Sequence, residues 1–153
     1  MPLDEASYAT AHVRSYRGAD RAAVVDLWQR TGIARPWNDL GAELDHHPHP
    51  DLRLVAEAPG GSVVGAVMGA WDGRRGWIYH LAVDADWRRR GVGQVLLDEV
   101  EERLRAMGVP KAQLLIRGDN LGVVGFYERC GYAPEDVRFM SKWLRPPGGG
   151  EPR

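Results

Sequence analysis

The chain has 153 residues, 44% of them hydrophobic and 27% charged, which favours one soluble globular domain with a buried core. Its formal net charge of -1 argues against a general nucleic-acid-binding surface, which would need a broad excess of lysine and arginine. One cysteine excludes an internal disulfide, and no apolar run approaches the roughly 20 residues that span a bilayer, so we expect a cytoplasmic protein without a membrane partner.

A single domain is expected over residues 11–144. Residues 1–10 have the composition of a flexible lead-in, and residues 145–153 that of a disordered tail, because their Pro and Gly offer nothing to bury. No internal repeat or linker interrupts the chain between these two segments.

Strands and helices are predicted along the whole of this domain. Apolar alternation or short apolar runs predict strands at 12–16, 52–58, 62–71, 77–83, 112–117 and 137–144. Helices are predicted from the cap Asp20 to Gly32, from Asp39 to His46, from about Val92 to Gly108, and from the cap Asn120 to Arg129. The order βααβββαβαβ predicts an α/β fold, with a mixed sheet and helices on both of its faces.

The segment DADWRRRGVGQ, residues 84–94, carries the strongest functional signal. It leads from a strand into an amphipathic helix, whose N terminus has unpaired backbone N–H groups and a positive dipole end that a phosphate would satisfy. Gly91 and Gly93 would let a diphosphate approach the main chain, and the arginines 88–90 add positive charge. We predict a phosphate site; the alternative is a solvated basic turn whose glycines serve helix–strand packing.

Two motifs in sequence order give the chain a family resemblance. LAVDADWRRRGVG, residues 81–93, resembles the acyl-CoA signature of the GNAT N-acetyltransferases, and N-x(4)-GFYERCGY, residues 120–132, resembles their asparagine and aromatic-tyrosine segment. The loop IARPWND, residues 33–39, is similar to that of a small bacterial GNAT subgroup. The resemblance implies the GNAT acyl-CoA N-acyltransferase fold, α/β (α+β), with a mixed, mostly antiparallel sheet of six or seven strands and about four helices.

The resemblance also implies acetyl-CoA as the acetyl donor and CoA as a product. Backbone N–H groups of residues 89–94 would bind the pyrophosphate, and the strand edge at 81–83 would pair with the pantetheine arm like an added strand. Asn120 would bond to that arm or cap the next helix, and both interpretations stay open. The residues assigned to the cofactor in this way are Leu81, Ala82, Val83, Arg88, Arg89, Arg90, Gly91, Val92, Gly93, Gln94, Asn120, Gly125 and Tyr127.

Tyr127 matches the tyrosine of the family's aromatic segment. The match implies a general acid, because a phenol near the sulfur can protonate the departing thiolate. The alternative is a packed aromatic residue beside Phe126 with its hydroxyl at the surface.

The general base is harder to find. Family members often carry a carboxylate or histidine early on the fourth strand or midway along the fifth, where this chain has Trp77 and Leu115. Substitutes are Tyr79, His80 and, through a water, Glu57. Strand alternation predicts that Tyr79 and His80 face opposite sides of the sheet, so that at most one of them faces the amine.

The absence of an obvious general base suggests an acceptor amine that is partly deprotonated at neutral pH. At pH 7 an α-amine is roughly 10% neutral and a lysine side chain under about 0.1%, a difference of some 200-fold. A chain without an obvious base is therefore better matched to a low-pKa amine or to a water relay.

The loop between the first two predicted helices would lie near the acceptor. Arg35, Trp37, Asn38 and Asp39 offer a cation, a flat apolar surface and an anion, which suit a small polar amine or a peptide end. The alternative for Asp39 is a helix N-cap. The histidines and prolines of residues 46–50 lack the spacing of a recognised metal site, so no metal is predicted.

These observations predict an acetyl-CoA-dependent N-acetyltransferase, in which an amine of a small molecule or a protein N terminus attacks the thioester directly. A non-catalytic acyl-CoA-binding or regulatory module of the same fold is the alternative. A nucleotide or dinucleotide site explains less, because GFYERCGY has no role in it. Exposed strands near the C terminus could pair between chains, which is compatible with a homodimer.

Overall fold

The computed structural model describes residues 10–146, so most of the predicted lead-in and tail lies outside the described residues. Within this range the chain forms two compact units. The first comprises residues up to Arg35 together with Asp39–Leu115, and the second comprises Pro36–Asn38 together with the residues from Ile116 onward.

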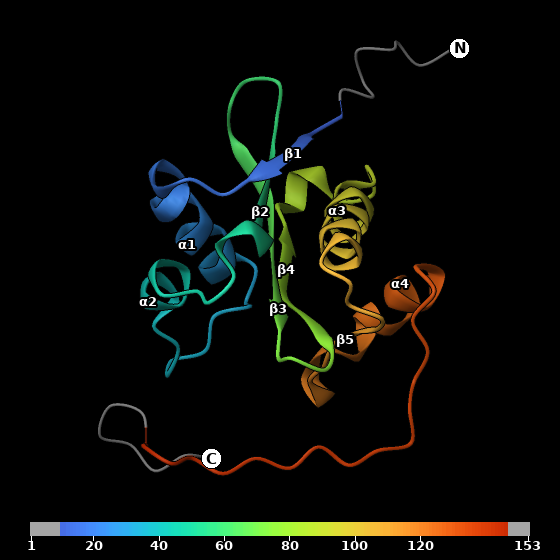
Figure 1. Ribbon diagram of the computed structural model, residues 1–153. Helices are drawn as coiled ribbons and strands as arrows, with labels where there is room; N and C mark the ends of the chain where they lie inside the picture. Colours follow the sequence, from blue (N-terminus) through green and yellow to red (C-terminus); the bar gives the residue numbers. More distant parts are fainter. Residues whose placement is uncertain (1–9, 147–153) are drawn as a thin grey trace. The chain divides into compact units, whose positions relative to one another are not determined.

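A five-stranded sheet forms the centre of the first unit (Figure 1). Its strands lie in chain order: β1 (His12–Ser15), β2 (Arg53–Glu57), β3 (Val63–Trp71), β4 (Gly76–Val83) and β5 (Ala112–Gln113). The first four strands are antiparallel, and β5 runs parallel to β4. The prediction of a mixed, mostly antiparallel sheet is confirmed, with five strands in place of six or seven.

Helices cover both faces of this sheet. The helices α1 (Arg21–Arg30) and α2 (Leu40–Asp45) lie on one face, and α3 (Val92–Ala106) lies on the other (Figure 1). The predicted four-residue spacing of α3 is confirmed, since Val92, Leu96, Val100 and Leu104 are all buried. Asp39 caps α2, because its carboxylate accepts a hydrogen bond from the Ala42 N–H at 3.0 Å.

The Asp20 side chain does not cap α1, contrary to the prediction. Its carboxylate accepts from the Arg17 N–H at 2.8 Å and binds the Arg14 guanidinium at 2.8 and 2.9 Å. The capping prediction for this side chain is therefore wrong, because a short 3-10 helix at Gly18–Asp20 precedes α1 and turns the carboxylate toward β1.

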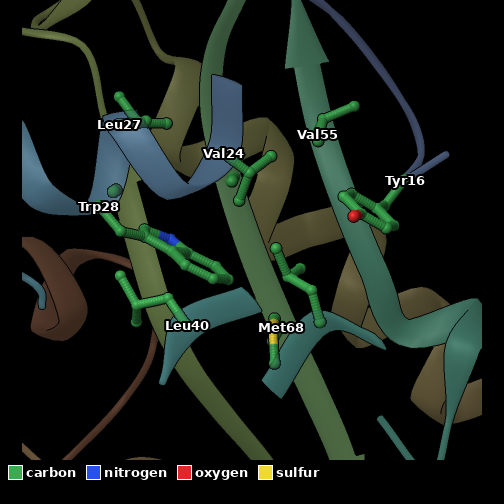
Figure 2. Close-up of a cluster of buried hydrophobic side chains, with 10 residues drawn as sticks. Tyr16, Val24, Leu27, Trp28, Leu40, Val55 and Met68 are labelled. Carbon is green, nitrogen blue, oxygen red and sulfur yellow. The ribbon is translucent and has the colours of Figure 1, made fainter. Parts of the chain in front are cut away.

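One apolar cluster joins α1 and α2 to the sheet (Figure 2). Trp28 is fully buried at its centre, and its indole Nε1–H donates to the His80 carbonyl of β4 at 2.9 Å. Buried indoles need a partner for this donor, so the hydrogen bond fixes both the tryptophan and the local path of β4. The other labelled members of the cluster are Tyr16, Val24, Leu27, Leu40, Val55 and Met68.

On the other face α3 lies close to β3 because β3 has glycines there. A Cβ on Gly65 would lie 2.8 Å from Leu96 and 2.9 Å from Val92, and a Cβ on Gly69 would lie 2.7 Å from Val100. These glycines have no need of unusual backbone angles; they make room for branched side chains of the helix.

The second unit contains a 3-10 helix at Gly118–Val123 and the helix α4 (Val124–Arg129). The predicted cap at Asn120 is wrong, because this residue lies at a kink inside the 3-10 helix and α4 begins after it. The predicted strand at 112–117 is reduced to Ala112–Gln113.

Residues 137–144 form no regular secondary structure, contrary to the predicted strand. Their apolar side chains are exposed, including Val137 at 75% and Phe139 at 69%. A strand requires a neighbour for its backbone hydrogen bonds, and no described strand pairs with this segment, so composition alone was insufficient.

The close approach of α3 to β3 gives a test of the fold. We expect Gly69→Ala to lower the free energy of unfolding by about 1–3 kcal/mol, because the new methyl group meets the stiff, buried Val100. Urea unfolding monitored by circular dichroism measures the change. Gly18→Ala is the matched control, since nothing lies within 4 Å of its Cβ position. Equal stability of the two variants would contradict this account of the packing.

Candidate functional site

The turn between β4 and α3 is held by Asp84. Its backbone N–H donates to the Val64 carbonyl at 2.8 Å, and its carboxylate accepts from the Asp86 N–H at 2.9 Å. The carboxylate also binds the Arg30 guanidinium of α1 at 2.8 Å. These hydrogen bonds hold the pKa of Asp84 below its usual value, so the anchor is charged at neutral pH.

Two residues of the arginine–glycine turn have left-handed backbone angles. Arg89 has a φ of 63°, and Gly91, the N-cap of α3, has a φ of 77°. A left-handed residue followed by a right-handed helix turns consecutive backbone N–H groups toward a common point, which is the geometry of an anion-binding nest. The Val95 N–H donates to the carbonyl of Gly91, the N-cap residue, at 3.1 Å. The backbone N–H groups before Val95 therefore lie ahead of the hydrogen bonds within the helix.

The space around this nest is open and positively charged. A Cβ at Gly91 would meet nothing within 4 Å, so this position faces open space. The side chains of residues 88–90 are exposed, and the Arg90 guanidinium lies 4.7 Å from the centroid of the Trp87 ring. The predicted phosphate site thus has amide donors, a helix N terminus and arginine charge together.

An unpaired strand edge leads toward this nest. The register of β4 with β5 covers only Gly76 and Trp77, opposite Ala112 and Gln113. At the predicted cofactor edge Leu81–Val83, Ala82 and Val83 keep their pairing with β3, and no strand lies on the other side of this edge among residues 10–146. An extended ligand can add to such an edge through main-chain hydrogen bonds.

A bulge interrupts β4 at His80. Tyr79 pairs with Met68 and Ala82 pairs with Ala66, so His80 and Leu81 together face the single residue Val67 of β3. His80 has a φ of 54°, a left-handed angle that is uncommon for a residue with a side chain.

The bulge overturns the predicted alternation of Tyr79 and His80. Their ring centroids are 5.2 Å apart, and both rings lie on the face covered by α1 and α2. The prediction that these side chains face opposite sides is wrong, because an extra residue in a strand resets the two-residue period.

The His80 ring is held by two helices. Its centroid lies 5.0 Å from that of the Trp28 ring of α1, and its Nε2 lies 2.9 Å from a carboxylate oxygen of Glu43 of α2. The side chains of His80 and Glu43 are 17% and 35% exposed, so water or a small molecule can reach the pair.

Tyr79 is bonded to a second histidine. Its hydroxyl lies 2.8 Å from His47 Nε2, and His47 Nδ1 accepts from the His49 N–H at 2.9 Å. A neutral imidazole that accepts at Nδ1 carries its proton on Nε2, so we assign His47 as the donor to the Tyr79 hydroxyl. Burial raises the pKa of Tyr79 to about 12, and this hydroxyl keeps its proton at neutral pH.

Glu57 lies apart from the other candidate bases. Its carboxylate binds the Arg14 guanidinium at 2.6 Å, which lowers its pKa and makes it a weaker base. It pairs with Val63, whereas Tyr79 pairs with Met68, five residues along β3 and so about 16 Å away at 3.3 Å per residue. The structure does not bring Glu57 together with Tyr79 and His80.

Trp77 and Leu115 occupy the two positions at which the resemblance would place the base. The Trp77 indole N–H donates to Asp72 at 2.8 Å across the hairpin that joins β3 and β4. Leu115 is exposed, and neither side chain takes a proton.

Tyr127 belongs to an aromatic cluster of the second unit. Its ring centroid lies 5.1 Å from that of Phe126 and 5.9 Å from that of Tyr132. Burial raises the pKa of Tyr127 to about 12, so the phenol is protonated at neutral pH. Gly125 lies in the same helix, α4, and Asn120 at the kink before it.

The predicted acceptor residues divide between the two units. Arg35 and Asp39 belong to the first unit, where the capping interpretation of Asp39 is confirmed. Trp37 and Asn38 belong to the second, in which the Arg117 guanidinium lies 5.8 Å from the centroid of the Trp37 ring.

Two site residues were missed by sequence reasoning. Glu43 is one of several acids in a polar loop and helix, and His47 belongs to a histidine-rich segment whose composition raises only the question of metal binding. His47 is buried, and His49 Nε2 lies 2.8 Å from the Trp71 carbonyl, so the segment is bound to β3 and β4. Leu40 and Leu44 share the buried face of α2, and Glu43 directly precedes Leu44. This helical spacing is the sequence signal that could have identified Glu43.

Comparison with known proteins places these features in context. The family model described as Acetyltransferase (GNAT) family matches residues 20–132. Acetyltransferase ECA0875 from Pectobacterium atrosepticum is 42% identical over 134 residues, which cover 86% of this chain and 94% of that protein.

Solved structures share the fold. Ard1 from Thermoplasma volcanium matches with a TM-score of 0.73 and 28% identity, over 81% of this chain and 83% of that one. A predicted acetyltransferase from Clostridium acetobutylicum, solved with acetyl-CoA, matches with a TM-score of 0.69 over 86% of this chain and 96% of that one. At 14% identity the second likeness shows the fold alone. Separately, none of the helices in residues 10–146 has the length and apolar character needed to cross a membrane.

The buried His47 predicts a pH-dependent stability. Burial and the nearby Arg53 lower the pKa of His47 from 6.5, so the unfolded chain binds this proton more readily than the folded one. The associated stability is present above pH 6.5 and is lost as the pH falls below it. We expect the free energy of unfolding to fall between pH 7 and pH 5, and to fall less in His47→Gln, as measured by urea unfolding.

The exposed His12→Gln is the control and should keep the wild-type pH dependence. The carboxylates with lowered pKa, Asp20 and Glu57, titrate below this window. An unchanged slope in His47→Gln would refute the assignment.

Proposed function

Because the chain belongs to the acetyltransferase (GNAT) family, we propose that it transfers the acetyl group of acetyl-CoA directly to a primary amine. The acceptor is an amine of a small molecule or a peptide N terminus. The observation that carries the proposal is the open nest of left-handed Arg89 and Gly91 at the start of α3, next to the unpaired edge of β4.

The residues of the turn fit a diphosphate tethered to an extended arm. The amides of residues 89–94 would hold the phosphates, the exposed arginines would supply charge, and the edge Leu81–Val83 would bond to the arm. Acetyl-CoA supplies the activated acetyl group as a thioester.

Tyr127 is proposed to donate a proton to the departing thiolate. Support comes from the family motif around it and from its raised pKa of about 12, which keeps the phenol protonated at neutral pH. Asn120 and Gly125 are proposed to contact the arm, on the resemblance alone.

The acceptor is proposed to be an amine of low pKa. Arg35, Trp37, Asn38 and Asp39 remain the proposed acceptor residues, although the Asp39 carboxylate also caps α2. An α-amine presents roughly 200-fold more neutral nitrogen at pH 7 than a lysine side chain does, so it requires a weaker base.

The nest predicts the effect of a single methyl group on CoA binding. We expect isothermal calorimetry to detect CoA binding by the wild type and an affinity on the order of 10-fold lower in Gly91→Ala, because a side chain strains the left-handed N-cap. Gly108→Ala is the matched control, since Gly108 also has a positive φ, 82°, and open space at the other end of α3. Absence of CoA binding by the wild type would overturn the proposed function.

Turnover gives the second test. With acetyl-CoA, alanyl-alanine amide should be acetylated faster at pH 7 than Nα-acetyl-lysine amide, by a factor approaching about 200 if the neutral fraction of the amine decides. Tyr127→Phe should lower kcat by about 100-fold or more and change CoA affinity far less than kcat. Thiol release measures the rate, and calorimetry measures the affinity.

Tyr132→Phe serves as the control within the same aromatic cluster. CoA binding without turnover on either amine, unchanged by Tyr127→Phe, would identify a non-catalytic acyl-CoA-binding module. Faster acetylation of the lysine probe would contradict the preference for a low-pKa acceptor.

A further inference from the structure

The bulge of β4 presents one imidazole in a defined orientation. His80 projects from a left-handed backbone, its ring lies beside Trp28, and the Trp28 indole N–H holds the His80 carbonyl at 2.9 Å. Glu43 reaches the same ring from α2, with an oxygen 2.9 Å from Nε2. A strained backbone angle persists only where its surroundings fix it, and such angles concentrate at functional sites.

We infer that His80 accepts the proton of the acceptor ammonium and that Glu43 is the positioning residue that orients its ring. The inference deepens the proposed function and rests on it. Glu43 acts through His80 and does not itself contact the amine.

The proton positions follow from the hydrogen bond. A carboxylate only accepts, so Nε2 carries the proton in the neutral ring and Nδ1 has the free lone pair. No hydrogen bond to Nδ1 is formed within residues 10–146. The ammonium N–H would transfer its proton to Nδ1, and the resulting imidazolium would be balanced by the Glu43 carboxylate.

The reaction then balances without another reagent. The amine nitrogen uses its freed lone pair to form the bond to the acetyl carbon, and the carbon–sulfur bond breaks. The ammonium proton held by His80 returns to water. The nitrogen loses a second proton as the amide forms, and this proton replaces, through solvent, the one that the donor at the sulfur gives to the departing thiolate. The products are an acetylated amine and CoA thiol.

The other groups near His80 are less suited to this task. The Tyr79 hydroxyl has a pKa raised to about 12, so it holds its proton, and it is bonded to His47. Trp28 has no basic atom available. Glu57, which lies on β2, is paired with Arg14 and remote along the sheet.

Chemical rescue tests the base. His80→Gly suits the left-handed angle and removes the ring, so kcat for alanyl-alanine amide should fall by about 100-fold or more. Millimolar imidazole should restore at least a tenth of the wild-type kcat in this variant and leave the wild type unchanged. His80→Asn, which also tolerates the backbone angle, should lose activity without rescue. His12→Gly is the matched control and should keep full activity.

Two Glu43 variants test positioning. Glu43→Gln keeps an acceptor and removes the charge, whereas Glu43→Leu removes both, so kcat should fall in the order wild type, Gln, Leu. The acid limb of the pH–kcat profile should shift in both variants, which loss of packing alone would not cause. Glu102→Gln, on an exposed pair of α3 with Arg105, is the control.

Nitrogen-15 NMR of the imidazole provides a readout without acetyl-CoA or acceptor. We expect the Nε2–H tautomer of His80 in the wild type, and a mixture of tautomers in Glu43→Leu. The other tautomer in the wild type, or His80→Gly with wild-type kcat, would overturn the inference while CoA binding and turnover left the proposed function intact. Failure of the wild type to bind CoA would instead remove the proposed function, and the tautomer would still decide whether Glu43 orients the ring.

Discussion

The hydrogen bond from the Trp28 indole to the His80 carbonyl connects the core of this protein to its candidate site. Trp28 is the largest fully buried side chain, and it holds the one point at which β4 departs from regular pairing. The extra residue puts two consecutive side chains on the same face of the sheet. Before the bulge, Tyr79 packs against the core, and at the bulge His80 turns its ring toward α1 and α2.

Electrostatics organises the opposite end of β4. The charged Asp84, paired with Arg30, closes the turn after the strand, and the following residues leave their amides ahead of the α3 ladder. The protein as a whole is close to neutral, so the arginines of this turn act locally and do not form a broad basic surface. Along one strand and one turn, the chain places in succession the imidazole that contacts Glu43 of α2, an open backbone edge and a turn with two left-handed residues.

The parts of this arrangement that depend on local rules were accessible from the sequence. The start of α3, its buried face and the glycine-rich turn follow from periodicity and glycine position, and the cap at Asp39 follows from helix chemistry. The bulge was not accessible, because a two-residue period carries no sign of one extra residue. The Glu43–His80 and His47–Tyr79 contacts join residues 37 and 32 positions apart, and the missing strand at 137–144 depends on a neighbour that composition does not specify.

The glycine at position 65 has a consequence for affinity. Because it admits Val92 and Leu96 so closely, methyl groups clamp the first turn of α3 to the sheet before any ligand arrives. Because the turn is already ordered, a ligand that binds there does not lose free energy to the ordering of a loop. A larger share of the interaction energy then contributes to the affinity. The same rigidity restricts what else the turn can accommodate, and discrimination among ligands would then depend on their shape.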